Sequence, residues 1–147
     1  MVLPPEAPHF NCRAGLGIMH ECCPVILECK RTPSRQAEGQ GRERALMVLI
    51  EEAQNDLEHQ CAYAFKKYSY SLSLMAIVSA GNHWSYAHVP FYMVPSMEDV
   101  YGAPPSQWDE VVWSNVVRVG SASSNADLAH IRHYLVENKT RNPIDNQ

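Results

Sequence analysis

Residues 42–68 are the part of the sequence that most constrains the fold. Their apolar side chains recur at about 100° per residue, the period of an α-helix with one buried side. They form one stripe: Leu46, Ile50, Ala53, Leu57, Cys61, Ala64 and Tyr68. Charged side chains lie largely outside this stripe, and Gln54 and Gln60 fall at its borders. A long helix of this kind needs a sheet or a second helix to cover its apolar stripe.

A strand is predicted at residues 25–30, in front of this helix. Side chains two positions apart in a strand share a face, so Glu28 and Lys30 should point the same way. The other face takes the remaining residues of the segment: Val25, Leu27 and Cys29. A carboxylate and an ammonium are therefore expected together at the end of a strand. Residues 10–18 are predicted to be the hairpin partner of this strand.

Two more strands are predicted after the helix. Residues 70–81 are apolar and stop at Gly81-Asn82, as expected for a mostly buried strand. Residues 83–94 alternate in character and should pair with them as a hairpin through residues 80–82. Trp84 and Tyr86, on one face of that segment, are predicted to pack in the core or across strands.

The rest of the chain predicts a loop, a strand and a helix. Residues 95–107 are rich in proline and predict a loop. Residues 108–120 favour a strand, and residues 123–140 carry apolar side chains at helical spacing with Ser124 or Asn125 as the cap. The whole order predicts an α/β (α+β) fold.

The composition limits the class of protein. The 147 residues suit a single domain over residues 1–147, and the net charge of -4 argues against binding through bulk positive charge. The sequence has neither the roughly 18 continuous apolar residues of a transmembrane helix nor the features of a signal peptide. An intracellular protein, nuclear or cytoplasmic, with no membrane partner is therefore predicted.

The cysteines are predicted to be reduced. Their number is odd and they contain no C-x-x-C pair: Cys12, Cys22, Cys23, Cys29 and Cys61. A zinc site built from His20, Cys22 and Cys23 is disfavoured, because adjacent cysteines lack the usual spacer of two to four residues.

The most basic stretch follows the first predicted strand. Residues 31–44 contain proline and two glycines and predict an exposed loop. Lys30 and this loop together hold five basic residues against two acidic ones. Arg31, Arg35 and Arg42 are the candidates for contacting a nucleic-acid backbone.

The residues Pro8-His9 and Glu28-Cys29-Lys30, with the long helix after them, resemble motifs one and two of the PD-(D/E)XK nuclease superfamily. In that superfamily Pro-Asp begins one strand and Asp/Glu-x-Lys follows on the next; here Glu28 comes 19 positions after His9. The resemblance covers residues 8–90. It implies a restriction-endonuclease-like mixed sheet flanked by the long helix, in a chain shortened at its N-terminus, followed by a C-terminal strand and helix.

The resemblance also implies a chemistry, the hydrolysis of phosphodiester bonds in DNA with Mg²⁺ or Mn²⁺. It assigns His9, Glu28 and the carbonyl of Cys29 to the metal. Lys30 would orient the attacking water or balance charge in the transition state. The family often places a glutamine on the following helix, and Gln60 matches it, so the expected catalytic residues are Glu28, Lys30, His9 and Gln60.

His9 departs from the family, which has an aspartate at this position. Mg²⁺ accepts an imidazole poorly, whereas Mn²⁺, Fe²⁺ and Zn²⁺ tolerate one. Two other hypotheses therefore stay open: a catalytically inactive nuclease-fold module that binds nucleic acid or protein, and a domain in which Glu28 and Lys30 form only an ion pair worth about 0–1 kcal/mol.

The remaining histidines give weaker signals. His130 and His133 lie at i and i+3 of the predicted C-terminal helix without a third ligand in a recognised pattern. His83 and His88 should fall on opposite faces of one strand and so cannot share a metal. Surface or packing roles are expected for all four.

Overall fold

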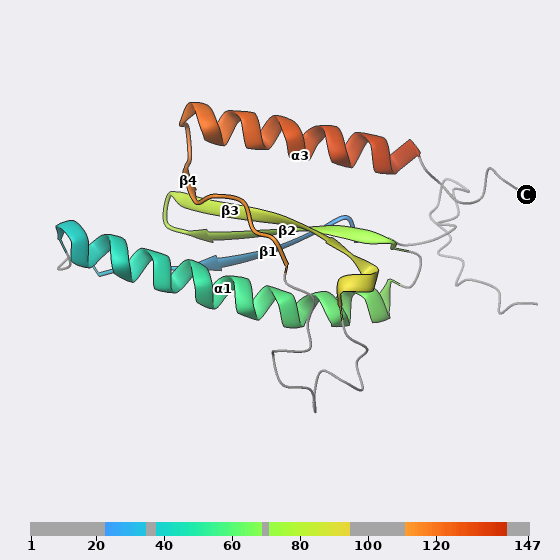
Figure 1. The fold of residues 1–147 in the computed structure, drawn as a ribbon, viewed down its shortest axis with the longest axis horizontal. Coiled ribbons are helices and arrows are strands. Elements are labelled where there is room, and N and C mark those ends of the chain that lie inside the picture. The colour runs from blue at the N-terminus through green and yellow to red at the C-terminus, as the bar shows by residue number, and fades with distance from the viewer. Residues whose placement is uncertain (1–22, 35–37, 69–70, 95–110, 141–147) are drawn as a thin grey trace, which may run out of the picture.

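The computed structural model describes residues 23–34, 38–68, 71–94 and 111–140, without the side chains of residues 138–140. In chain order the elements are β1 (Val25–Lys30), α1 (Gly39–Lys67), β2 (Ser73–Ala80), β3 (His83–Pro90), the 3₁₀ turn η1 (Phe91–Met93), β4 (Val117–Arg118) and α3 (Ala122–Thr140). The described part has three layers, with α1 on one face of the sheet and α3 on the other (Figure 1). The predicted mixture of helices and strands is confirmed.

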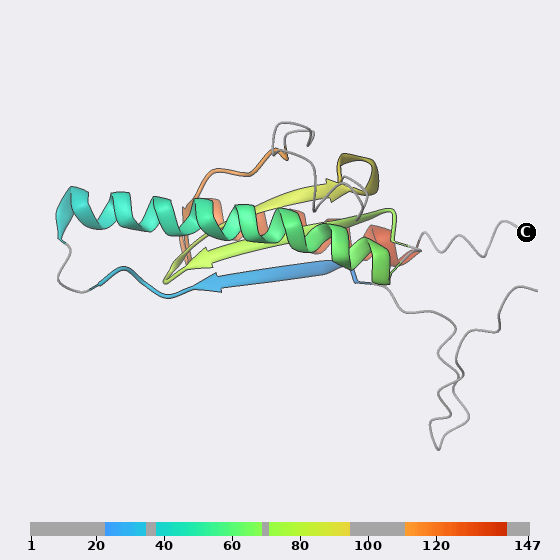
Figure 2. The same cartoon turned by 90° about the horizontal axis from the view of Figure 1, so that it is seen from below.

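The sheet is mixed and has the order β1-β2-β3-β4. β1 and β2 are parallel, which requires a long crossover, and α1 supplies it. β2 and β3 are antiparallel and joined through Gly81-Asn82, so the predicted hairpin is confirmed. Both views show the first turns of α1 extending beyond the ends of β1 and β2 (Figure 2).

The apolar stripe of α1 is buried as predicted. Ile50, Ala53, Leu57 and Cys61 are fully inaccessible to solvent. They pack against the side chains that β2 and β3 direct toward α1, chiefly Leu74, Ala76, Val78, Ala87 and Val89. β2 is apolar almost throughout because helices cover both of its faces.

The opposite face of the sheet packs against α3. Met75, Trp84 and Ile131 form its buried centre, which confirms Trp84 as a packing residue. The Trp84 indole N–H donates to the buried Ser124 hydroxyl at 3.0 Å. Tyr86 is half-buried at the border of the same cluster.

Three predicted boundaries are wrong. α1 begins at Gly39, three residues before its predicted start at residue 42, so the loop predicted for residues 31–44 ends earlier than expected. Gly39, the first residue of α1, has a φ of +55°, a conformation that favours glycine, and Gly41 follows in the same turn.

The strand predicted at residues 108–120 is shorter in the structure. Of its described residues only those of β4 form a strand, and residues 111–116 lie outside any strand. The Ser114 hydroxyl accepts a hydrogen bond from the Tyr86 N–H at 3.0 Å, in place of a main-chain carbonyl. The predicted caps Ser124 and Asn125 lie inside α3, and the Ser121 hydroxyl accepts the Ser124 N–H at 3.1 Å instead.

Several predictions concern residues outside the described part of the chain: His9, His20, Cys22, Arg35, the strand at 10–18 and the loop at 95–107. Within the described part, no helix combines the length and the apolar character needed to cross a membrane.

Candidate functional site

Glu28 and Lys30 lie side by side on β1. Ile26, two residues earlier, packs into the core under α1, so the alternation of the strand directs Glu28 and Lys30 toward the α1 side as well. The Lys30 Nζ atom is 3.4 Å from the Glu28 Oε1 atom. Leu27 and Cys29, on the other face of β1, are exposed; β1 is the outermost of the strands that the structure describes. The predicted pairing of carboxylate and ammonium is confirmed.

A second carboxylate reaches Lys30 from α1. The Lys30 Nζ atom donates to the Asp56 Oδ2 atom at 2.5 Å. Lys30 and Glu28 are about three-quarters buried, with side chains 25% and 26% exposed, whereas Asp56 is 52% exposed. The three residues therefore form a cluster that is anchored on the sheet and open to solvent at the helix.

The electrostatics of the cluster keep Lys30 charged. The hydrogen bond to Asp56 raises the pKa of Lys30, partial burial opposes this rise, and the bond to Glu28 adds to it. One ammonium thus lies between two carboxylates. This is also an arrangement of oxygens that a small divalent cation can use.

The metal chemistry implied for this cluster can be tested against the residues present. Among the described residues no group of three or more histidine, cysteine, aspartate or glutamate side chains could hold a metal ion. Mg²⁺, however, is commonly bound through one or two carboxylates with water completing its shell. Glu28 and Asp56 supply two carboxylates, each of them in contact with Lys30, and the predicted third ligand, His9, lies outside the described residues.

Asp56 is the residue that sequence reasoning missed. It lies between Ala53 and Leu57 at the border of the apolar stripe, next to the strand that carries Lys30. The sequence signal that could have indicated Asp56 was a charged residue beside the apolar stripe of the helix. Gln60, the catalytic residue predicted on this helix, is exposed one turn further along α1 than Asp56. Gln54 is half-buried.

The other candidate side chains have structural roles. His133 lies 3.2 Å from Glu137 on α3, and the His130 ring lies near the Tyr86 ring, with 6.1 Å between centroids and a tilt of 41° between the planes. His83 and His88 lie on opposite faces of β3, as predicted, since His83 faces the α1 side with Ser85 and His88 contacts Tyr134 of α3.

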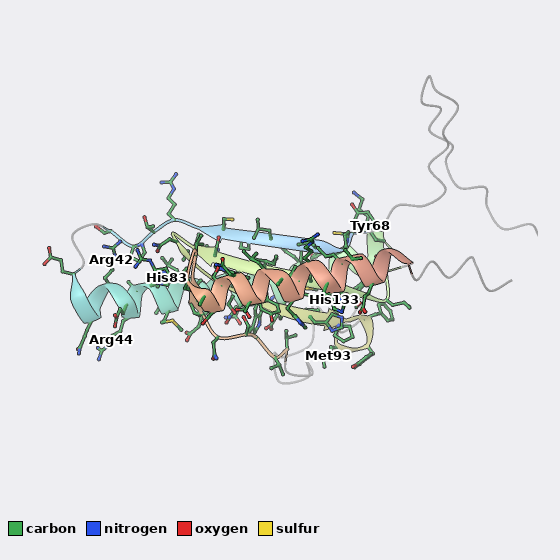
Figure 3. The ribbon with its side chains drawn as sticks, turned by 90° about the horizontal axis from the view of Figure 1, so that it is seen from above. Arg42, Arg44, Tyr68, His83, Met93 and His133 are labelled. Carbon is green, nitrogen blue, oxygen red and sulfur yellow. The ribbon has the colours of Figure 1, made fainter. Side chains whose placement is uncertain are left out.

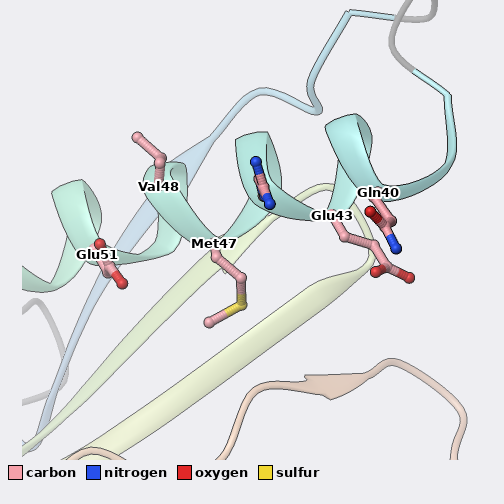
Figure 4. Close-up of a pocket in the computed structure, with 6 residues that line it drawn as sticks. Gln40, Glu43, Met47, Val48 and Glu51 are labelled. Atoms are coloured by element: carbon pink, nitrogen blue, oxygen red, sulfur yellow. The ribbon is translucent and has the colours of Figure 1, made fainter.

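The predicted nucleic-acid contacts Arg31 and Arg42 are both exposed, at the end of the molecule to which β1 points. Arg42 lies at this end with Arg44 and His83 (Figure 3). A hollow of about 590 Å³ along the first turns of α1 is lined by Gln40, Glu43, Arg44, Met47, Val48 and Glu51 (Figure 4). All six belong to one helix, so this hollow has no opposing wall and is separate from Glu28 and Lys30.

Comparison of the chain with protein-family models, with curated proteins and with solved structures finds no match in any of the three.

Proposed function

We propose that this chain is a restriction-endonuclease-like, metal-dependent nuclease that hydrolyses phosphodiester bonds in DNA at Glu28, Lys30 and Asp56. The observation that carries the proposal is the position of the Lys30 ammonium between two carboxylates, at 2.5 Å from Asp56 and 3.4 Å from Glu28. A lysine beside paired carboxylates matches the components that phosphodiester hydrolysis needs: oxygen ligands for a cation and a positive group for the developing charge.

The arrangement of the elements supports the same proposal. Glu28-Cys29-Lys30 ends a strand, the long helix α1 follows, and β2 returns parallel to that strand. This is the order expected from the resemblance to the PD-(D/E)XK superfamily. Among the described strands β1 is the outermost, and Asp56 is half exposed, so a polymer can approach the cluster from the helix side.

Each residue has a defined role in this proposal. Glu28 and Asp56 would hold Mg²⁺ or Mn²⁺, which supplies Lewis-acid polarisation of the phosphate and a more acidic bound water. Lys30 stays protonated and stabilises negative charge on the phosphate oxygens. Arg31, Arg35 and Arg42 would neutralise neighbouring phosphates of the strand.

A second candidate function is a nuclease-fold module that binds nucleic acid or protein without cleaving it. Two observations favour it. Lys30 already forms ion pairs with both Glu28 and Asp56. The described residues contain no cluster of three metal ligands. In such a module Glu28, Lys30 and Asp56 would join β1 to α1 and have no chemical role.

Cleavage assays separate these two functions. Wild-type protein should cleave DNA faster with Mn²⁺ than with Mg²⁺, because His9 replaces the oxygen ligand of the family. His9→Asp should raise the rate with Mg²⁺. Glu28→Ala should abolish cleavage with either metal, and Lys30→Ala should slow it by about 10²-fold or more while metal binding persists.

The Glu28→Ala protein, purified in parallel, is the control for contaminating nucleases. Cleavage by neither the wild type nor His9→Asp, with either metal, would overturn the catalytic proposal in favour of the binding module. Cleavage that survives Glu28→Ala would place the activity elsewhere.

A further inference from the structure

A cavity of about 310 Å³ lies just beyond the end of β1. Three segments form its walls: the loop after β1, the first turns of α1 and the hairpin turn between β2 and β3. Ala80, which lines it, is the register partner of Lys30 in the parallel pair of β1 and β2. The cavity therefore lies next to the backbone end of β1, at the carboxyl ends of parallel strands where α/β sheets commonly bind ligands. Asp56, which holds the Lys30 ammonium, comes ten residues after Leu46 of the cavity wall, about 15 Å further along α1.

The walls of this cavity are held together by a close approach at Gly81. Gly81 has a φ of +60°, and a Cβ at this position would lie 2.3 Å from the Thr32 Cγ2 atom. Only glycine permits both the backbone conformation and this contact. Pro33, the next residue of the loop, is buried. The loop and the hairpin turn thus pack directly on each other and give the cavity a fixed frame.

The polar side chains that line the cavity are mostly hydrogen-bond donors. They are the Arg42 guanidinium, the His83 imidazole, the Asn82 amide and the Thr32 hydroxyl. In the part of the chain that the structure describes, Arg42 forms no ion pair.

One acidic residue, Glu43, also lines the cavity, and it lines the hollow of Figure 4 as well. In that view its carboxylate lies on the same side of α1 as Gln40 and Met47. The cavity thus combines a guanidinium that has no ion pair among the described residues with side chains that can donate hydrogen bonds, a set that recognises the oxygens of a phosphate group.

We propose that this cavity binds a phosphate group of a DNA strand through Arg42, His83, Asn82 and Thr32. The inference rests on the proposed function, because a phosphate bound here would hold the DNA strand at the end of β1, with another part of the same strand able to reach Lys30. Arg42 binds the phosphate as a fork of two N–H donors, and the other side chains fix its position.

The test is DNA binding without a divalent cation, measured on the full chain in EDTA by fluorescence anisotropy of a labelled duplex at several salt concentrations. Arg42→Ala should weaken binding about tenfold and reduce the slope of log affinity against log salt by about one. His83→Ala should also weaken binding. Arg42→Lys should keep the salt slope and lose less affinity, because the charge remains and only the fork is lost.

Arg44→Ala is the matched control. It removes the same charge from the same helix two positions away, about 200° around the axis, and Arg44 lines the hollow of Figure 4 and not this cavity. Its effect on affinity should be less than about twofold. Equal effects of Arg42→Ala and Arg44→Ala, in proteins with wild-type circular dichroism, would overturn the proposal.

A second measurement distinguishes a strand phosphate from free phosphate. NMR signals of His83 should shift on adding a duplex DNA, and Arg42→Ala should suppress that shift. A shift produced by inorganic phosphate and not by DNA would identify a free-phosphate site and overturn the strand proposal. Because no cleavage occurs in EDTA, these results are independent of whether Glu28→Ala abolishes hydrolysis.

Discussion

The Asp56 carboxylate on α1 lies 2.5 Å from the Lys30 ammonium on β1, although 26 positions separate the two residues. The contact joins the edge strand of the sheet to the helix that covers it. Lys30 also contacts Glu28, so the ammonium is held from the strand and from the helix at once. This relationship brings two carboxylates into contact with one ammonium.

The ion pairs of Lys30 predict a loss of stability at alkaline pH. Asp56, more than Glu28, raises the pKa of Lys30 above its ordinary value of 10.5. A pKa that is raised in the folded state stabilises the fold below the unfolded pKa, and the effect disappears as pH rises through the folded pKa. The difference in unfolding free energy between wild type and Lys30→Met should be constant from about pH 7 to 9 and shrink above about pH 10.5. Urea titrations at each pH measure it, and a difference that does not change with pH would contradict the prediction.

His88 predicts a loss of stability at acid pH. Partial desolvation beside α3, and His130 in addition, lower the pKa of His88 from its ordinary value of 6.5, although the residue as a whole is exposed. The groups that face it are His130 and the Tyr134 ring, whose centroid is 4.8 Å away. Since the unfolded chain binds the proton more readily, stability should fall as pH drops below about 6.5 and level off below the folded pKa.

Thermal unfolding between pH 8 and 5 tests this effect of His88. His88→Gln should flatten the pH dependence in that range. Identical pH profiles for wild type and His88→Gln would contradict the prediction.

Gly81→Ala should destabilise the hairpin turn more than Gly120→Ala. Both glycines have positive φ, +60° and +83°, so both substitutions carry a backbone penalty of about 1–2 kcal/mol. Only at Gly81 does the added Cβ meet a neighbour, the Thr32 methyl group, which adds about 1–3 kcal/mol. Chemical denaturation measures both costs. Adding Thr32→Ser to Gly81→Ala should recover the steric part, and equal costs for the two glycines would contradict this account.

Ser124→Ala should weaken the attachment of α3 to the sheet. The substitution leaves the buried Trp84 indole N–H without the hydroxyl that accepts it at 3.0 Å. An unsatisfied buried donor costs about 1–3 kcal/mol of unfolding free energy. Adding Ser124→Ala to Trp84→Phe should cost less than adding it to the wild type, because no donor is then left unpaired. A double-mutant cycle measures this coupling, and strict additivity would contradict it.

The sequence was sufficient to predict α1, the β2–β3 hairpin and the shared face of Glu28 and Lys30. Each of these depends on local periodicity, which burial then preserves. The start of α1 was missed because Gly39 and Gly41 favour loops, and the short β4 because the Ser114 side chain takes a ladder hydrogen bond.

The role of Asp56 could not be predicted in the same way. Periodicity places Asp56 at the border of the α1 stripe, but the packing of α1 across the sheet decides which strand that border meets. Likewise, the cavity beside Gly81 depends on a loop and a turn far apart in sequence, and no local pattern joins Thr32 to His83.

The cleavage rate of Asp56→Asn tests the central claim most directly, because this substitution keeps the size of the side chain and removes only its charge. With Mn²⁺ and a labelled DNA, the rate should fall by about 100-fold, since the cation loses one of its two carboxylates. Glu51→Gln, an equivalent change at an exposed position of α1 outside the cluster, should stay within about twofold of the wild type. A wild-type rate for Asp56→Asn would contradict the assignment of Glu28, Lys30 and Asp56 to one hydrolytic site.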